Sequence, residues 1–157
     1  MQLYDMTLPQ LLMYNAHRFS DRVALREKEF GIWQTVTWRQ FADHVRAFAM
    51  GLRALGVQRG DKVAIIGDNR PEWLYAELAA QAIGGASIGV YQDSVAEEVR
   101  YLVEAADARV IVAEDQEQVD KIIEIWPRTP RYSQGHLLRT ERIAPLSGTV
   151  PRQLPRN

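Results

Sequence analysis

The sequence predicts an α/β fold in which parallel strands are layered with helices. Three short apolar segments suit strands that are buried on both faces, and they begin 24 and then 23 residues apart. These segments are residues 62–67, 86–90 and 109–113. The residues between and after them carry apolar side chains at helical spacing, as Val99, Leu102 and Ala106 show. Parallel strands need such crossover helices, so a truncated parallel βαβαβα sheet is expected, with helices at residues 72–83, 95–106 and 116–125.

The first 60 residues predict a helix, two strands and a second, longer helix. Residues 23–27 and 33–37 are typical of the two strands of a hairpin that turns near Gly31. Residues 38–55 carry large apolar side chains at steps of three and four, and Gly56 can cap the end of that helix. The sheet is therefore preceded by an α-β-β-α lead-in.

Five helix starts are marked by a capping residue that is followed three positions later by Glu or Gln. The pairs are Thr7 and Gln10, Thr37 and Gln40, Asn69 and Glu72, Ser94 and Glu97, and Asp115 and Gln118. Five marked starts agree with the five expected helices.

The charge distribution divides the chain into two parts. Residues 1–126 contain 13 basic and 19 acidic residues, whereas residues 127–157 contain six arginines, one acidic residue and five of the seven prolines. The first part is predicted to be an incomplete domain, and residues 127–157 are predicted to be an unrelated, disordered Arg/Pro-rich tail. A nucleic-acid-binding arm is the alternative for this tail, but its arginines are spread singly and Tyr132 is the only aromatic residue after Trp126.

Composition excludes several classes of site. The absence of cysteine excludes disulfides, a cysteine nucleophile and thiolate-bound metals. The three histidines, His17, His44 and His136, are not at metal-ligand spacing, so no metal site is expected. No apolar run approaches the roughly 20 residues that span a bilayer, which predicts a cytoplasmic protein without a transmembrane segment.

No residue in this sequence is predicted to be catalytic or to bind a cofactor. The loop Gly67-Asp68-Asn69-Arg70 has one glycine and a carboxylate where a phosphate would lie, and the other strand-to-helix loops are acidic. His44 lies at the border of the apolar stripe of its helix, which favours a half-buried structural histidine. Gly84 and Gly85 are expected to end a helix and allow close packing, and Arg59-Gly60-Asp61 is expected to be a turn.

Residues 7–125 resemble the beginning of a bacterial long-chain fatty-acid–CoA ligase, a member of the adenylate-forming (AMP-binding) superfamily. The resemblance rests on the order and spacing of several segments. They are Thr7-Leu-Pro-Gln-Leu-Leu12, Asp21-Arg-Val-Ala-Leu-Arg-Glu27, Leu55-Gly-Val-Gln-Arg-Gly-Asp-Lys-Val-Ala-Ile65, Asn69-Arg-Pro-Glu-Trp73 and Ser94-Val-Ala-Glu-Glu98. The chain departs from the family at Gln92 and Asp93, where a proline or asparagine and a threonine are usual.

The resemblance implies a two-step reaction in a complete enzyme. A fatty acid carboxylate attacks the α-phosphate of ATP to give an acyl-adenylate and pyrophosphate, and coenzyme A then displaces AMP. The family's phosphate loop ending in Pro-Lys-Gly has no full counterpart here, and Ser147-Gly148-Thr149 resembles it only faintly. The ATP, Mg²⁺ and coenzyme A of the family therefore imply no cofactor for this chain alone, which is expected to be inactive.

Three hypotheses follow for the chain as a whole. In the first, it is a truncated ligase whose last 31 residues arise from a frameshift, since 16 arginines against three lysines suggest GC-rich coding DNA. In the second, it is a short non-enzymatic α/β binding or interaction module. In the third, it is one part of a split ligase that a second polypeptide completes. The second hypothesis would use a partner chain at an exposed sheet edge, and the third a polypeptide that supplies the ATP site.

Overall fold

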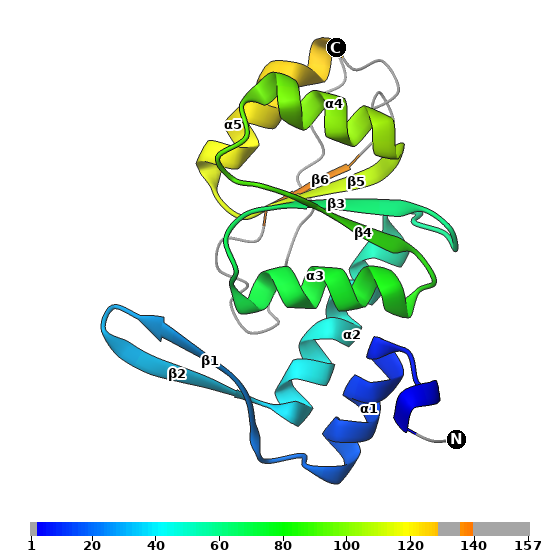
Figure 1. Ribbon diagram of the computed structural model, residues 1–157, viewed down its shortest axis with the longest axis vertical. Helices are drawn as coiled ribbons and strands as arrows, with labels where there is room; N and C mark the ends of the chain where they lie inside the picture. Colours follow the sequence, from blue (N-terminus) through cyan, green and yellow to red (C-terminus); the bar gives the residue numbers. More distant parts are fainter. Residues whose placement is uncertain (1–2, 129–135, 140–157) are drawn as a thin grey trace.

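The computed structural model describes residues 3–128 and 136–139 of this protein (Figure 1). A lead-in of helices and a hairpin precedes an α/β unit, so the predicted fold class is confirmed. The lead-in consists of the 3-10 helix η1 (Leu3–Asp5), α1 (Leu8–Arg18), β1 (Val23–Glu29), β2 (Ile32–Thr37) and α2 (Trp38–Ala54). The α/β unit consists of β3 (Lys62–Ile66), α3 (Pro71–Ala82), β4 (Ala86–Val90), α4 (Ala96–Ala106), β5 (Ala108–Ala113), α5 (Gln116–Ile125), the 3-10 helix η2 (Trp126–Arg128) and β6 (His136–Arg139).

The main sheet has four parallel strands in the order β4-β3-β5-β6. From β3 the chain moves to β4 on one side, and then crosses back to β5 on the other side. The helices form two layers: α3 lies with α2 and α1 on one face of the sheet, and α4 and α5 cover the other face (Figure 1). Because β4 and β5 lie on opposite sides of β3, the chain reverses its direction across the sheet after β4.

Both faces of β3 are buried, which explains why its sequence is a continuous apolar run rather than an alternating one. Val63 and Ile65 belong to a core cluster with side chains of α1, α2 and α3. Ala64 and Ile66 belong to a second cluster with side chains of α4 and α5. The residues of β3 thus separate two cores and hold the two helical layers together.

The helix starts follow the predicted pattern at three of five positions. Thr7, Thr37 and Asp115 are N-caps whose side chains accept the backbone N–H three residues later. The predicted caps Asn69 and Ser94 are each wrong by one residue, since α3 is capped by Arg70 and α4 by Val95. Proline prefers the first position of a helix, so Pro71 sets the start of α3. At α4, the Glu98 carboxylate accepts the N–H of Val95 at 3.3 Å.

Part of the region predicted to be a disordered tail has regular structure. Residues 127 and 128 belong to η2, and residues 136–139 form β6, which pairs with β5 in parallel from Val110 and His136 onward. The backbone provides a reason, because β5 would otherwise present an unpaired row of N–H and C=O groups. The remaining residues after 128, including Ser147-Gly148-Thr149, lie outside the described residues, and the boundary at residue 126 stays a prediction.

Candidate functional site

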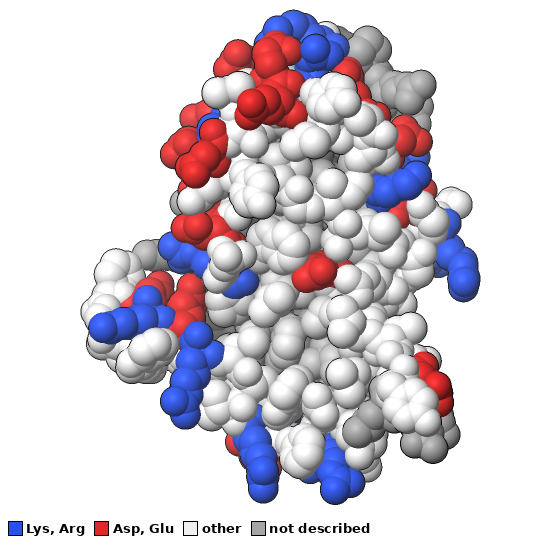
Figure 2. All heavy atoms as spheres, in the orientation of Figure 1, with Lys and Arg blue, Asp and Glu red and all other residues white. Residues whose placement is uncertain are grey.

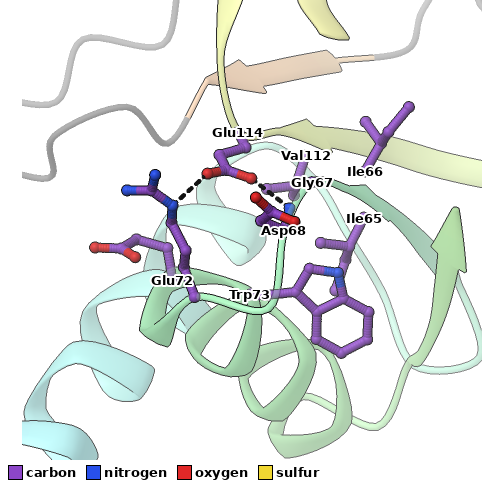
Figure 3. A pocket seen from close by; sticks show the side chains of 9 residues that line it. Ile65, Ile66, Gly67, Asp68, Glu72, Trp73, Val112 and Glu114 are labelled. Carbon is purple, nitrogen blue, oxygen red and sulfur yellow. Dashed lines mark hydrogen bonds and ion pairs between the residues drawn. The ribbon is translucent and has the colours of Figure 1, made fainter. Parts of the chain in front are cut away.

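The crevice at the carboxyl ends of β3 and β5 is the candidate site on topological grounds. In open α/β sheets, ligands bind where connections from two neighbouring strands leave toward opposite faces, and α3 and α5 do so here. A cavity at this position is lined by Gly67, Asp68, Arg70, Glu72, Trp73 and Glu114 (Figure 3). Its volume of about 10 Å³ has room for about one water molecule.

The Glu114 side chain fills the crevice. Its carboxylate accepts the backbone N–H of Asp68 and lies 2.7 Å from Nε of Arg70 (Figure 3). Gly67 permits this approach, because a Cβ at that position would lie 2.6 Å from Cβ of Glu114. The place where an anionic ligand could meet the start of α3 is therefore occupied by a carboxylate of the chain itself.

Arg70 joins three parts of the chain. Besides Glu114 after β5, its guanidinium lies 3.9 Å from the carboxylate of Glu27 on β1. Burial raises the pKa of Glu27, the neighbouring Glu72 raises it further, and Arg70 opposes both effects. The arrangement can fix the hairpin and the two loops relative to each other, but it leaves Arg70 engaged with carboxylates. The sequence gives no signal for this cluster, since Arg70 and Glu114 are 44 positions apart.

The two other strand-to-helix loops also have structural roles. Asp115 caps α5, because its side-chain carboxylate accepts a hydrogen bond from the N–H of Gln118. After β4, Lys121 donates to the carbonyl of Gln92, which ties this loop to α5. The departure from the family pattern at Gln92 therefore falls in a loop that the chain holds with its own lysine.

Glycine positions behave as predicted. Gly84 has a φ of 83° at the end of α3, and a Cβ on Gly85 would lie 2.8 Å from the carbonyl oxygen of Asp61. Arg59-Gly60-Asp61 is a turn in which the Asp61 carboxylate accepts the N–H of Gln58 at 2.7 Å. Gly84 and Gly85 thus end α3 and allow close packing of the backbone, and Gly60 has the positive φ that its turn requires.

His44 is half-buried, as its place at the border of the apolar stripe predicts. Its ring stacks on Tyr75, with centroids 4.8 Å apart and planes 17° from parallel. Burial lowers the pKa of His44, although Asp43 partly opposes this effect. His17 lies in the last turn of α1, and His136 begins β6. Within residues 3–128 and 136–139, no three acidic or histidine side chains gather as a metal site would require.

Acidification is expected to destabilise the fold through His44. Its pKa is lowered in the folded chain, so below the ordinary value of 6.5 the unfolded chain binds more protons and the free energy of unfolding falls with falling pH. A His44→Phe variant keeps a ring against Tyr75 but does not titrate. Thermal melts between pH 8 and 5 should show a larger loss of Tm for the natural chain, and identical pH profiles would contradict this role.

Comparison with known proteins connects these observations. Residues 12–152 match the sequence profile of a family described as AMP-binding enzyme, and this match runs beyond the boundary predicted at residue 126. The rat long-chain-fatty-acid–CoA ligase ACSBG2 is 37% identical over 122 residues, which are 78% of this chain and 18% of the relative. The ligase FadD15 of Mycobacterium tuberculosis is 32% identical over 126 residues, which are 80% of this chain and 20% of the relative.

Solved structures agree on the fold. The anthranilate CoA ligase AuaEII, in complex with anthranoyl-AMP, superposes with a TM-score of 0.76 at 22% identity, over 88% of this chain and 26% of that one. The N-terminal subdomain of NpsA from Klebsiella oxytoca superposes with a TM-score of 0.62 at 29% identity, over 69% of this chain and 28% of that one. The chain thus spans about a fifth of the sequence relatives and about a quarter of these structures.

Proposed function

The chain belongs to the AMP-binding enzyme family, and from this premise we propose that it is one part of a long-chain fatty-acid–CoA ligase. The observation that carries the proposal is the 37% identity to the rat ligase over 122 residues. The complete enzyme would join a fatty acid to coenzyme A through an acyl-adenylate, with release of pyrophosphate and AMP. We place this reaction in the cytoplasm; among the described residues, no helix has the length and apolarity of a membrane span.

We also propose that these 157 residues have no ligase activity by themselves. The sequence contains no Pro-Lys-Gly, and the crevice at the ends of β3 and β5 is filled by Glu114 and Arg70. At this crevice the carboxylates of Glu27 and Glu114 are both paired with Arg70, so neither is free to hold Mg²⁺. ATP, Mg²⁺ and coenzyme A would be bound by the parts of the ligase that this sequence does not contain.

The structural contribution of the chain would be the first α/β unit of the ligase. Among the described residues, β4 pairs with β3 alone, so its other edge is open. Residues 86–90 contain no charged side chain and no proline that would discourage another strand. This edge suits the contact with the rest of the ligase.

A chimeric ligase tests the proposal. The chain is fused to FadD15 of Mycobacterium tuberculosis in place of the fifth of FadD15 that it matches. Exchange of pyrophosphate into ATP is then measured with palmitate for the chimera, for FadD15, and for each piece alone. We expect exchange by FadD15 and the chimera, and none by either piece.

The two parts of the proposal fail separately in this assay. Exchange by the 157-residue chain alone would contradict its inactivity. A chimera that is folded by circular dichroism but inactive, beside an active FadD15, would contradict membership in a ligase. Recovery of activity on mixing the two separate pieces would identify the split arrangement.

A further inference from the structure

The tip of the β1–β2 hairpin exposes three bulky apolar side chains within four residues. Phe30 is 87% exposed, Ile32 is 65% exposed and Trp33 is 63% exposed. The hairpin projects from the side of the α/β unit, so its tip lies at the outside of the molecule (Figure 1 and Figure 2). Large apolar side chains clustered at an exposed tip are typical of a surface that contacts an apolar partner.

Phenylalanine is an unusual residue for the backbone of this turn. Phe30 and Gly31 form a two-residue loop with φ values of 48° and 82°. Such a loop favours Asn or Asp before Gly, because a bulky residue with positive φ is disfavoured. A phenylalanine at this position costs conformational energy and buries almost none of its surface, so packing within the described residues does not explain it.

The two faces of the hairpin differ in charge. Glu27 lies 3.9 Å from Arg70, which places the Glu27 face of β1 toward the body of the protein. Side chains alternate along a strand, so Arg26 and Lys28 lie on the opposite, outward face. Lys28 is directly paired with Trp33, which therefore shares this outward face.

The remaining charged side chain at the tip, that of Glu29, lies on the inward face. Glu29 is paired with Ile32 and alternates with Lys28, so it shares the Glu27 face. The outward face thus combines two cations with a tryptophan beside a projecting phenylalanine.

We propose that this hairpin tip docks on an anionic phospholipid surface. Phe30 and Trp33 enter the boundary between headgroups and acyl chains, while Arg26 and Lys28 meet lipid phosphates, which is the combination of side chains that interfacial segments use. A stable protein–protein interface buries about 1,200–2,000 Å² in total, more than the few side chains of a two-stranded tip provide. A lipid surface needs only the insertion of these side chains.

This docking would serve a ligase for long-chain fatty acids, whose substrate partitions into bilayers. The lipid contact does not depend on ligase activity, however, since it rests on the exposed side chains and charges of the hairpin. The two proposals can therefore fail independently.

Sedimentation with vesicles tests the docking. The full chain is mixed with vesicles of phosphatidylcholine alone, or with one-third phosphatidylserine, at low and at physiological salt. We expect binding to the anionic vesicles that weakens with salt. A Phe30→Asn variant should bind at least about tenfold less, because an apolar side chain of this size gains that much on leaving water. Its Tm should not fall, because Asn-Gly suits the turn.

Matched variants separate the tip from other exposed surfaces. Tyr101, which is 68% exposed on α4, serves as the control, and Tyr101→Ser should bind vesicles like the natural chain. Addition of anionic vesicles should shift the tryptophan emission to the blue, and Trp33→Phe should remove this shift. The proposal is overturned if the folded natural chain does not sediment with anionic vesicles, if Phe30→Asn binds equally well, or if the shift persists without Trp33.

Discussion

Replacing Leu52 by alanine is expected to lower the free energy of unfolding by about 3–5 kcal/mol. Leu52 of α2 is fully buried in the core cluster on the α2 and α3 side of the sheet. Removal of buried leucine carbons costs their transfer into water and leaves a cavity that neighbours fill only partly. A domain of this size has about 5–15 kcal/mol of stability in total, so a fifth or more of it would be lost.

Met50 provides the matched control for this prediction. It lies two residues away on the same helix but is 68% exposed, so Met50→Ala should change the free energy of unfolding by no more than about 0.5 kcal/mol. Urea unfolding followed by circular dichroism measures both variants. Similar losses for Leu52→Ala and Met50→Ala would show that α2 does not present the Leu52 side to the core.

The elements of the α/β unit could be predicted because burial fixes their composition. β3 is buried on both faces, and a sequence such as Val63-Ala-Ile-Ile66 suits that environment and little else. The long α2 likewise follows from apolar side chains on one face, with Thr37 and Gln40 marking its start. These signals are local, so the sequence displays them directly.

The arrangement of these elements depends on contacts that no local pattern records. Spacing shows that strands and helices alternate, but the order β4-β3-β5-β6 requires the chain to reverse across the sheet. That reversal creates the crevice and brings Arg70 and Glu114 together. In the sequence, each of these two residues has the pattern of an ordinary charged surface residue. Their pairing could not be predicted, because no local pattern connects positions 44 residues apart.

The turn at Phe30 illustrates a different limit. The hairpin was predicted from its two strands and Gly31, and the structure confirms it. Turn preferences alone give no reason for phenylalanine with positive φ, and a local preference that is violated in this way often marks function. The exposure of Phe30 beside Trp33 becomes visible only when the hairpin is seen projecting from the body.

Replacing Gly67 by alanine is expected to lower the free energy of unfolding by about 1–3 kcal/mol through crowding at the candidate site. The new Cβ would lie 2.6 Å from Cβ of Glu114, which is the root of that side chain. Rotation about the side-chain bonds of Glu114 cannot relieve this contact, so the backbone after β3 or after β5 must move. That movement would disturb both bonds of Glu114, to the N–H of Asp68 and to Arg70.

Gly51 offers the same substitution where space is free. It lies within α2, and a Cβ there would meet no atom within 4 Å. Alanine is favoured over glycine inside a helix, so Gly51→Ala should raise the free energy of unfolding by about 0.5–1 kcal/mol. One added methyl group should therefore stabilise the chain at residue 51 and destabilise it at residue 67. Urea unfolding gives the sign for each variant, and stabilisation by both would mean that Glu114 does not fill the crevice against Gly67.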